Sequence, residues 1–201
     1  MAAPLTEAVR QSVRGRRSTR RLTMSKRKSQ DELAGDLAQA LQDAVNLFRE
    51  LGIGYALIGG LAAMVHGRSR YTEDVDFVAD PGHDETLASH PDVMEKHRFD
   101  PSCTWKLYHR SGVTIDLWKD EHAAGIVKRA VRRKLGNRFA KVAEPHDLVA
   151  MKLRADRPQD DYDIAQIIAA QDLDSTRLKP LVTAAQFRRF TAIGKRVARA
   201  D

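Results

Sequence analysis

The sequence predicts an α/β protein in which helices flank a small mixed β-sheet and the C-terminal part is helical. Short runs of strand-forming residues, such as 55–58 and 74–79, alternate with longer segments whose apolar residues recur at helical spacing. From Pro145 onward only the helical spacing remains. Hydrophobic residues make up 42% of the 201 residues, and no apolar run is long enough to cross a bilayer. We therefore expect one ordinary core and no membrane-spanning segment.

The sheet-containing core is expected at residues 31–143. The first helix has apolar residues at helical spacing from Leu33 to Leu51 and ends at Gly52. The predicted strands are residues 55–58, 74–79, 104–109, 113–118 and 139–143, of which the third and fourth form a hairpin around a glycine-containing turn. The remaining predicted helices are residues 61–66 and 84–97 and, in a C-terminal cap at 144–201, one that begins at Pro145 and others at 161–170, 174–186 and 187–200.

Positive charge is concentrated at the N-terminus. Residues 1–30 contain nine Lys or Arg and one acid, whereas the remaining residues carry 25 basic and 26 acidic groups. The net charge of +7 is thus a property of this segment, which lacks a core-forming pattern and is predicted to be a disordered tail. Cys103 is the single cysteine and cannot form an internal disulfide, which fits a reducing cytoplasm.

Two aspartates one residue apart are the most informative local pattern. Asp74 and Asp76 lie in a predicted strand, where side chains at positions i and i+2 point to the same face. Asp116 lies in a second strand with alternating apolar residues, where a charge is costly unless it is paired or bound to a ligand. If the two strands are neighbours, three carboxylates converge and suit one or two Mg²⁺ ions. The alternative is a set of strand acids that face water.

Residues around these acids suggest a phosphate ligand. Gly59 and Gly60 fall at a predicted strand-to-helix turn, where backbone N–H groups can approach a phosphate, although a plain tight turn has the same sequence. Arg70 and Thr72 come just before the acids, and Arg70 can contact phosphate oxygens or pair with a neighbouring acid.

Taken together, these motifs resemble the DNA-polymerase-beta-like nucleotidyltransferases, and in particular the minimal and abortive-infection-type branch found in bacterial toxin–antitoxin systems. The resemblance covers roughly residues 50–170. Its first block comprises Gly59-Gly60, His66-Gly67, Arg70-x-Thr72-x-Asp74-x-Asp76 and the separate strand acid Asp116. Its second block comprises the stretch from Glu144 through Lys152, then Arg157 and Asp160 to Asp163.

The resemblance implies a nucleotidyltransferase fold and a Mg²⁺-dependent transfer of a nucleoside monophosphate from an NTP such as ATP. It implies that Asp74 and Asp76 bind Mg²⁺ and that Asp116 helps to activate an acceptor hydroxyl. It further implies that Gly59 and Gly60 cradle the nucleotide phosphates. The implied acceptor is a hydroxyl of RNA, such as tRNA, or of a protein, and a cognate toxin or antitoxin protein is an implied partner.

The second block has its own implied role. Lys152 would reach a phosphate from the cap, and Asp160 or Asp163 would hold it or its neighbours. Arg157 is a further candidate cation.

Two other functions fit the same residues. One is a catalytically silent, antitoxin-like or regulatory binding module on the same fold, and the other is a metal-dependent nuclease. Separately, six basic residues between Lys128 and Arg138 form a cluster, and helical spacing would place Arg129, Arg132 and Arg133 on one face. Such a face could hold RNA or simply be solvated.

Overall fold

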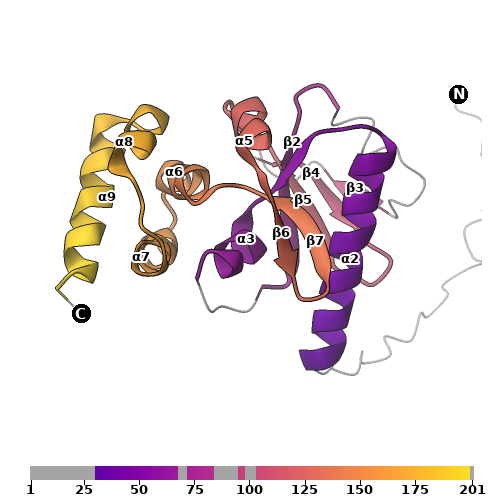
Figure 1. The fold of residues 1–201 in the computed structure, drawn as a ribbon. Helices are drawn as coiled ribbons and strands as arrows, with labels where there is room; N and C mark the ends of the chain where they lie inside the picture. The colour runs from indigo at the N-terminus through magenta and orange to yellow at the C-terminus, as the bar shows by residue number, and fades with distance from the viewer. Residues whose placement is uncertain (1–29, 68–71, 84–94, 98–102, 200–201) are drawn as a thin grey trace, which may run out of the picture.

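A seven-stranded mixed sheet forms the centre of the molecule, and helices lie on both of its faces (Figure 1). The computed structural model describes residues 30–67, 72–83, 95–97 and 103–199. The order of the strands across the sheet is β3-β4-β5-β2-β1-β7-β6. In chain order the strands are β1 (Tyr55–Leu57), β2 (Asp74–Ala79), β3 (Glu95–His97), β4 (Cys103–Tyr108), β5 (Thr114–Trp118), β6 (Val131–Leu135) and β7 (Arg138–Val142).

The helices fall into two groups (Figure 1). Three accompany the sheet: α2 (Gln30–Glu50), α3 (Gly59–Val65) and α5 (Ala123–Arg129). The others follow β7 and gather on one side of the molecule: α6 (Pro145–Ala155), α7 (Asp160–Ala170), α8 (Ser175–Leu178), the short 3₁₀ helix η1 (Lys179–Leu181) and α9 (Ala184–Val197). Within the described part of the chain, none of these helices combines the length and apolar character needed to cross a bilayer.

Aromatic packing fixes α2 against the sheet. The ring of Phe48 on α2 stacks on Tyr55 of β1, with 4.6 Å between centroids, and meets the edge of Phe77 on β2 at 5.0 Å. All three side chains are buried. Because residues alternate along β2, the face that carries Phe77 packs against α2, and the opposite face is left to Asp74 and Asp76.

Strand register positions the acids. β2 pairs with β5 in parallel, with Asp76 directly opposite Asp116, and pairs with β1 in antiparallel fashion, with Phe77 opposite Leu57. β1 leads directly into α3 at Gly59. The start of α3 and the start of β2 therefore lie at the same end of the β1–β2 pair, beside the acids.

The C-terminal helices form a packed group with buried apolar side chains such as Leu153, Ile164 and Ile193. α6 begins at Pro145, whose missing N–H is not needed in the first turn. α9 begins with a capping box in which Thr183 and Gln186 satisfy each other's backbone N–H groups.

The predicted architecture, a mixed sheet flanked by helices with a helical C-terminal part, is confirmed, but the sheet is larger than expected. Two edge strands, β3 and β6, were not predicted. Residues 95–97 form β3 and do not continue a helix, while residues 84–94 of that expected helix lie outside the described residues. Residues 1–29 of the predicted tail also lie outside them.

Candidate active site

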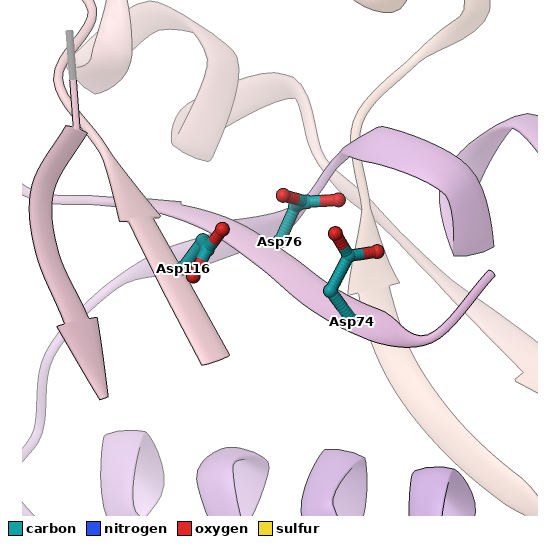
Figure 2. Close-up of side chains that lie close together, drawn as sticks. All are labelled: Asp74, Asp76 and Asp116. Atoms are coloured by element: carbon teal, nitrogen blue, oxygen red, sulfur yellow. The ribbon is translucent and has the colours of Figure 1, made fainter. Parts of the chain in front are cut away.

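Three carboxylates gather at the start of β2 (Figure 2). Asp74 and Asp76 project from the same face of β2, and Asp116 projects from β5 beside them. One oxygen from each of the three lies within 4.8 Å of the others. Asp76 and Asp116 are buried, at 8% and 5% exposure, whereas Asp74 is half-buried. The alternation of two strands and their parallel register therefore produce the convergence that the sequence predicts.

The burial of Asp76 has an electrostatic cost. Desolvation by burial, with the nearby Asp74 carboxylate second, raises the pKa of Asp76 to about 6, although hydrogen bonds from Trp118 and the Gly60 backbone N–H oppose the shift. Three carboxylates this close favour protonation of one of them unless a cation lies between them. Among the described residues, the three acids therefore outnumber the one lysine, Lys106, that pairs with them.

Glycine at positions 59 and 60 makes room for the acids. A Cβ atom on Gly59 would lie 1.8 Å from Asp76 Oδ2, and Gly59 has a positive φ of 63° that disfavours other residues. A Cβ atom on Gly60 would lie 2.5 Å from Thr72 Oγ1. The pair was predicted to cradle phosphates, and the structure gives it an additional role, because the Gly60 N–H already donates to the Asp76 carboxylate.

Hydrogen bonds orient two of the carboxylates. Trp118 Nε1 donates to Asp76 Oδ1 at 2.7 Å, and Thr72 Oγ1 donates to Asp74 Oδ1 at 2.6 Å. Trp118 was not among the predicted site residues. Its position two residues after Asp116 on the same strand was the available signal, since β5 runs beside β2.

Asp116 has a partner that the sequence did not reveal. Lys106 Nζ on β4 forms an ion pair with Asp116 Oδ2 at 2.9 Å. Burial raises the pKa of Asp116, and the hydrogen bond and charge of Lys106 only partly offset that rise. Asp116 Oδ1 is buried and has no hydrogen-bond partner among the described residues. That oxygen is the free acceptor of this carboxylate.

A cleft of about 770 Å³ opens beside Asp74 and Asp76 and is lined on its other side by residues of α6 and α7. Lys152 of α6 is buried in this second wall, where its Nζ contacts Asp160 Oδ1 at 3.2 Å and Asp163 Oδ2 at 2.5 Å. Arg157 also bonds Asp160, and its guanidinium lies 5.8 Å from the centroid of the Trp118 ring. The second sequence block therefore faces the first across the cleft.

The remaining predicted residues lie partly in the cleft and partly elsewhere. Thr72 lines the cleft and contacts Asp74, whereas Arg70 lies outside the described residues. The predicted helical face of Arg129, Arg132 and Arg133 is wrong, because α5 ends at Arg129 and the other two belong to strand β6. Arg129 instead forms a bidentate ion pair with the buried Asp147.

The residues present fit a divalent cation. All three groups offer carboxylate oxygens, which are the ligands that Mg²⁺ takes in proteins. One of these oxygens, Asp116 Oδ1, is buried without a partner. The carboxylates that line the adjoining cleft also outnumber its basic groups. Bound cations would offset this excess of negative charge.

Comparisons with known proteins give the fold some context. No family model matches the chain, and no curated protein matches it either. Among solved structures, it is similar to an antigenic nucleotidyltransferase-like protein from Paracoccidioides brasiliensis (21% identity over 85% of this chain and 89% of that one, TM-score 0.48).

Two antibiotic-resistance proteins are also similar. The lincomycin-bound lincosamide antibiotic adenylyltransferase LnuA matches at 16% identity over 71% of this chain and 98% of its own, with a TM-score of 0.49. The antibiotic-resistance factor ANT(2'')-Ia, a solution structure, matches at 14% identity over 83% of this chain and 100% of its own, with a TM-score of 0.48. With scores below 0.5, the function has to be inferred from this chain's own side chains.

Proposed function

We propose that this protein is a Mg²⁺-dependent nucleotidyltransferase that moves a nucleoside monophosphate from an NTP to a hydroxyl acceptor. The observation that carries the proposal is the cluster of Asp74, Asp76 and Asp116 beside a cleft that the first two acids line and whose far wall holds Lys152. Converging carboxylates can hold the Mg²⁺ ions that stabilise developing charge in phosphoryl transfer.

The three acids would have different roles in the reaction. Asp74 and Asp76 would hold Mg²⁺ together with the triphosphate. Asp116 Oδ1 would accept the proton that the acceptor hydroxyl loses, since Oδ2 is taken by Lys106. The acceptor oxygen would then bond to the α-phosphorus as the bond to the β-phosphate oxygen breaks, so that pyrophosphate leaves. Bound Mg²⁺ would neutralise the charge that develops on the phosphate oxygens.

The cleft walls would position the nucleotide. Gly59 and Gly60 line the cleft and would contact the phosphates there, and Thr72 would orient Asp74. Lys152 would face the phosphates from α6, with Asp160 and Asp163 holding its ammonium group. Arg70 is proposed as a further phosphate contact from its place in the sequence motif.

The test is incorporation of label from each α-labelled NTP in the presence of Mg²⁺, with bulk tRNA and with the protein itself as acceptors. We expect label in RNA or protein that disappears with EDTA and with Asp76→Asn. The matched control is Glu73→Gln, which removes an exposed carboxylate three residues before Asp76. Equal incorporation by Asp76→Asn and wild type would refute the proposal.

The same experiment separates the two alternatives. A catalytically silent binding module would bind NTP or a partner protein without incorporating label. A nuclease would shorten the RNA without labelling it. A role in a toxin–antitoxin or phage-defence system stays a prediction from the sequence resemblance, and a cytoplasmic location stays a prediction from the single cysteine.

A further inference from the structure

A second hollow lies away from the acids, between α2 and the β6–β7 hairpin. Its volume is about 770 Å³, and its basic lining residues are Arg49, Arg132, Arg138 and Lys141. We call this set the basic hollow. The sole acid in its lining, Asp80, accepts a hydrogen bond from the Gly54 backbone N–H at 3.0 Å. The hollow therefore presents a strong excess of positive charge.

These cations have no acidic partners in the described part of the chain. Arg49 bonds the neutral Asn46, and Arg132 lies over the ring of Phe139 at 4.0 Å. Arg138 Nε is buried and has no hydrogen-bond partner among the described residues. An unpaired buried donor costs stability unless a ligand satisfies it.

Strand register also brings two of these positive charges together. Arg132 stands directly opposite Lys141 in the β6–β7 ladder, and like charges at such positions destabilise a sheet. Basic residues on an edge strand can also serve to prevent pairing with other chains. That role would explain β6, but it does not explain Lys141 and Arg138 on the inner strand β7 or Arg49 on α2. A bound polyanion explains all of them.

The chemistry of the hollow favours nucleic acid over other polyanions. Three of its four cations are arginines, whose planar guanidinium groups bind phosphates through two hydrogen bonds and stack on rings. Phe139 is 42% exposed, which suits stacking on a base. An acidic peptide would use the charges but not the exposed surface of the ring.

We infer that the basic hollow binds a single-stranded segment of nucleic acid through its phosphates, with a base stacked on Phe139. The hollow shares no lining residue with the catalytic cleft. The two lie at opposite ends of β2, which starts at Asp74 in the cleft and leads to Asp80 in the hollow. Six residues of strand span about 20 Å. This is an additional binding site, and it would stand even if nucleotidyl transfer were disproved.

The test is binding of a fluorescent oligouridylate to the full chain, measured by anisotropy without NTP or Mg²⁺ over a series of salt concentrations. The hollow variant is Arg132→Gln/Lys141→Gln, two exposed positions. Its matched control is Lys179→Gln/Lys195→Gln, which removes the same charge from exposed positions in the C-terminal helices. The basic segment at residues 1–30 is identical in all three proteins and contributes equally to each.

The expected loss follows from counterion release. Removing two phosphate contacts should lower the slope of log K against log salt by about 1.4 and the affinity at ~0.1 M salt by about 25-fold. Phe139→Ala should lower the affinity by about tenfold through loss of stacking. The control double variant should bind within about twofold of wild type, since its charges lie outside the hollow.

Three results would overturn the inference. The first is equal weakening by the hollow variant and the control, which would mean that only net charge matters. The second is equal binding of oligouridylate by Phe139→Ala and wild type. The third is binding of polyglutamate as tight as that of oligouridylate, with the same dependence on Arg132 and Lys141, which would identify an acidic protein segment as the ligand. Melting curves for each variant would establish that it is folded.

Discussion

Replacing Asp76 by asparagine should stabilise the metal-free protein while abolishing its response to magnesium. Burial of the Asp76 side chain and the nearby charge of Asp74 together raise the pKa of Asp76 from 3.8 to about 6. At neutral pH the ionised Asp76 carboxylate therefore lowers the stability of the folded state. Asparagine has nearly the same shape, carries no charge, and keeps an oxygen that can accept from Trp118 Nε1.

The magnitude follows from the pKa of Asp76. A rise from 3.8 to about 6 corresponds to about 3 kcal/mol at neutral pH, at roughly 1.4 kcal/mol per pKa unit. Asparagine has one oxygen fewer to accept hydrogen bonds, and the loss of one bond would cost about 1 kcal/mol. The net gain is then about 2 kcal/mol, or roughly 4–8 °C in Tm for a protein of this size.

The sign of the pH dependence is fixed by the same pKa. Because the folded pKa of Asp76 lies above the unfolded value, the stability that its protonation provides is fully present below pH ~4 and is lost as pH rises through ~6. The advantage of Asp76→Asn should therefore be complete near pH 7.5 and should fade as the pH falls from ~6 to ~4.

The assay is thermal and urea unfolding of wild type, Asp76→Asn and Glu73→Gln, each in EDTA and in Mg²⁺. We expect Asp76→Asn to be the most stable protein in EDTA and to gain nothing from Mg²⁺, and the exposed Glu73→Gln control to follow wild type. A folded Asp76→Asn that is no more stable than wild type in EDTA at pH 7.5 would refute the reasoning on buried charge. An equal gain from Mg²⁺ in both proteins would show that the ion binds elsewhere.

Three further substitutions test other parts of the structure. Gly59→Ala should abolish Mg²⁺ stabilisation, because its Cβ would lie 1.8 Å from Asp76 Oδ2; unchanged Mg²⁺ binding by calorimetry would contradict this. Lys152→Met should lower the free energy of unfolding in urea by about 3–5 kcal/mol, because the buried Asp163 would lose its cation; a loss below about 1 kcal/mol would argue against a buried ion pair. Gly194→Ala should raise stability by about 0.5–1 kcal/mol, since the position is helical and open, and a decrease would indicate a contact that the structure does not contain.

The three acids of the candidate site could be predicted from sequence because their signal is local. Alternation along a strand places Asp74 and Asp76 on one face whatever the surrounding fold is. Asp116 stood out because it interrupts an apolar strand. The pairing of β5 with β2 was the remaining condition, and the observed register satisfies it.

The edge strands could not be predicted because they lack a local signal in the sequence. β6 is bonded on one side only, and its first four residues are exposed, so no alternation of apolar residues marks it as a strand. Its Arg and Lys residues fit a solvated helix equally well. The second edge strand, β3, is three residues long and includes Glu95, Lys96 and His97, too short for any period to emerge.

The partners of the acids were missed because they depend on tertiary structure. Lys106 meets Asp116 only through the β4–β5 register, which includes an irregularity between Cys103 and Trp105. Lys152 could be assigned to the site from the second sequence block, but its burial between Asp160 and Asp163 depends on the packing of α6 against α7.

The contact between Gly59 and Asp76 constrains how this sequence can diverge. The volume that a side chain at position 59 would need is already filled by the carboxyl group at position 76. A larger residue at 59 becomes tolerable only if 76 shrinks or its strand shifts. In a set of homologous sequences the two positions should therefore covary, and glycine at 59 should accompany aspartate at 76 even in members that have lost the other acids.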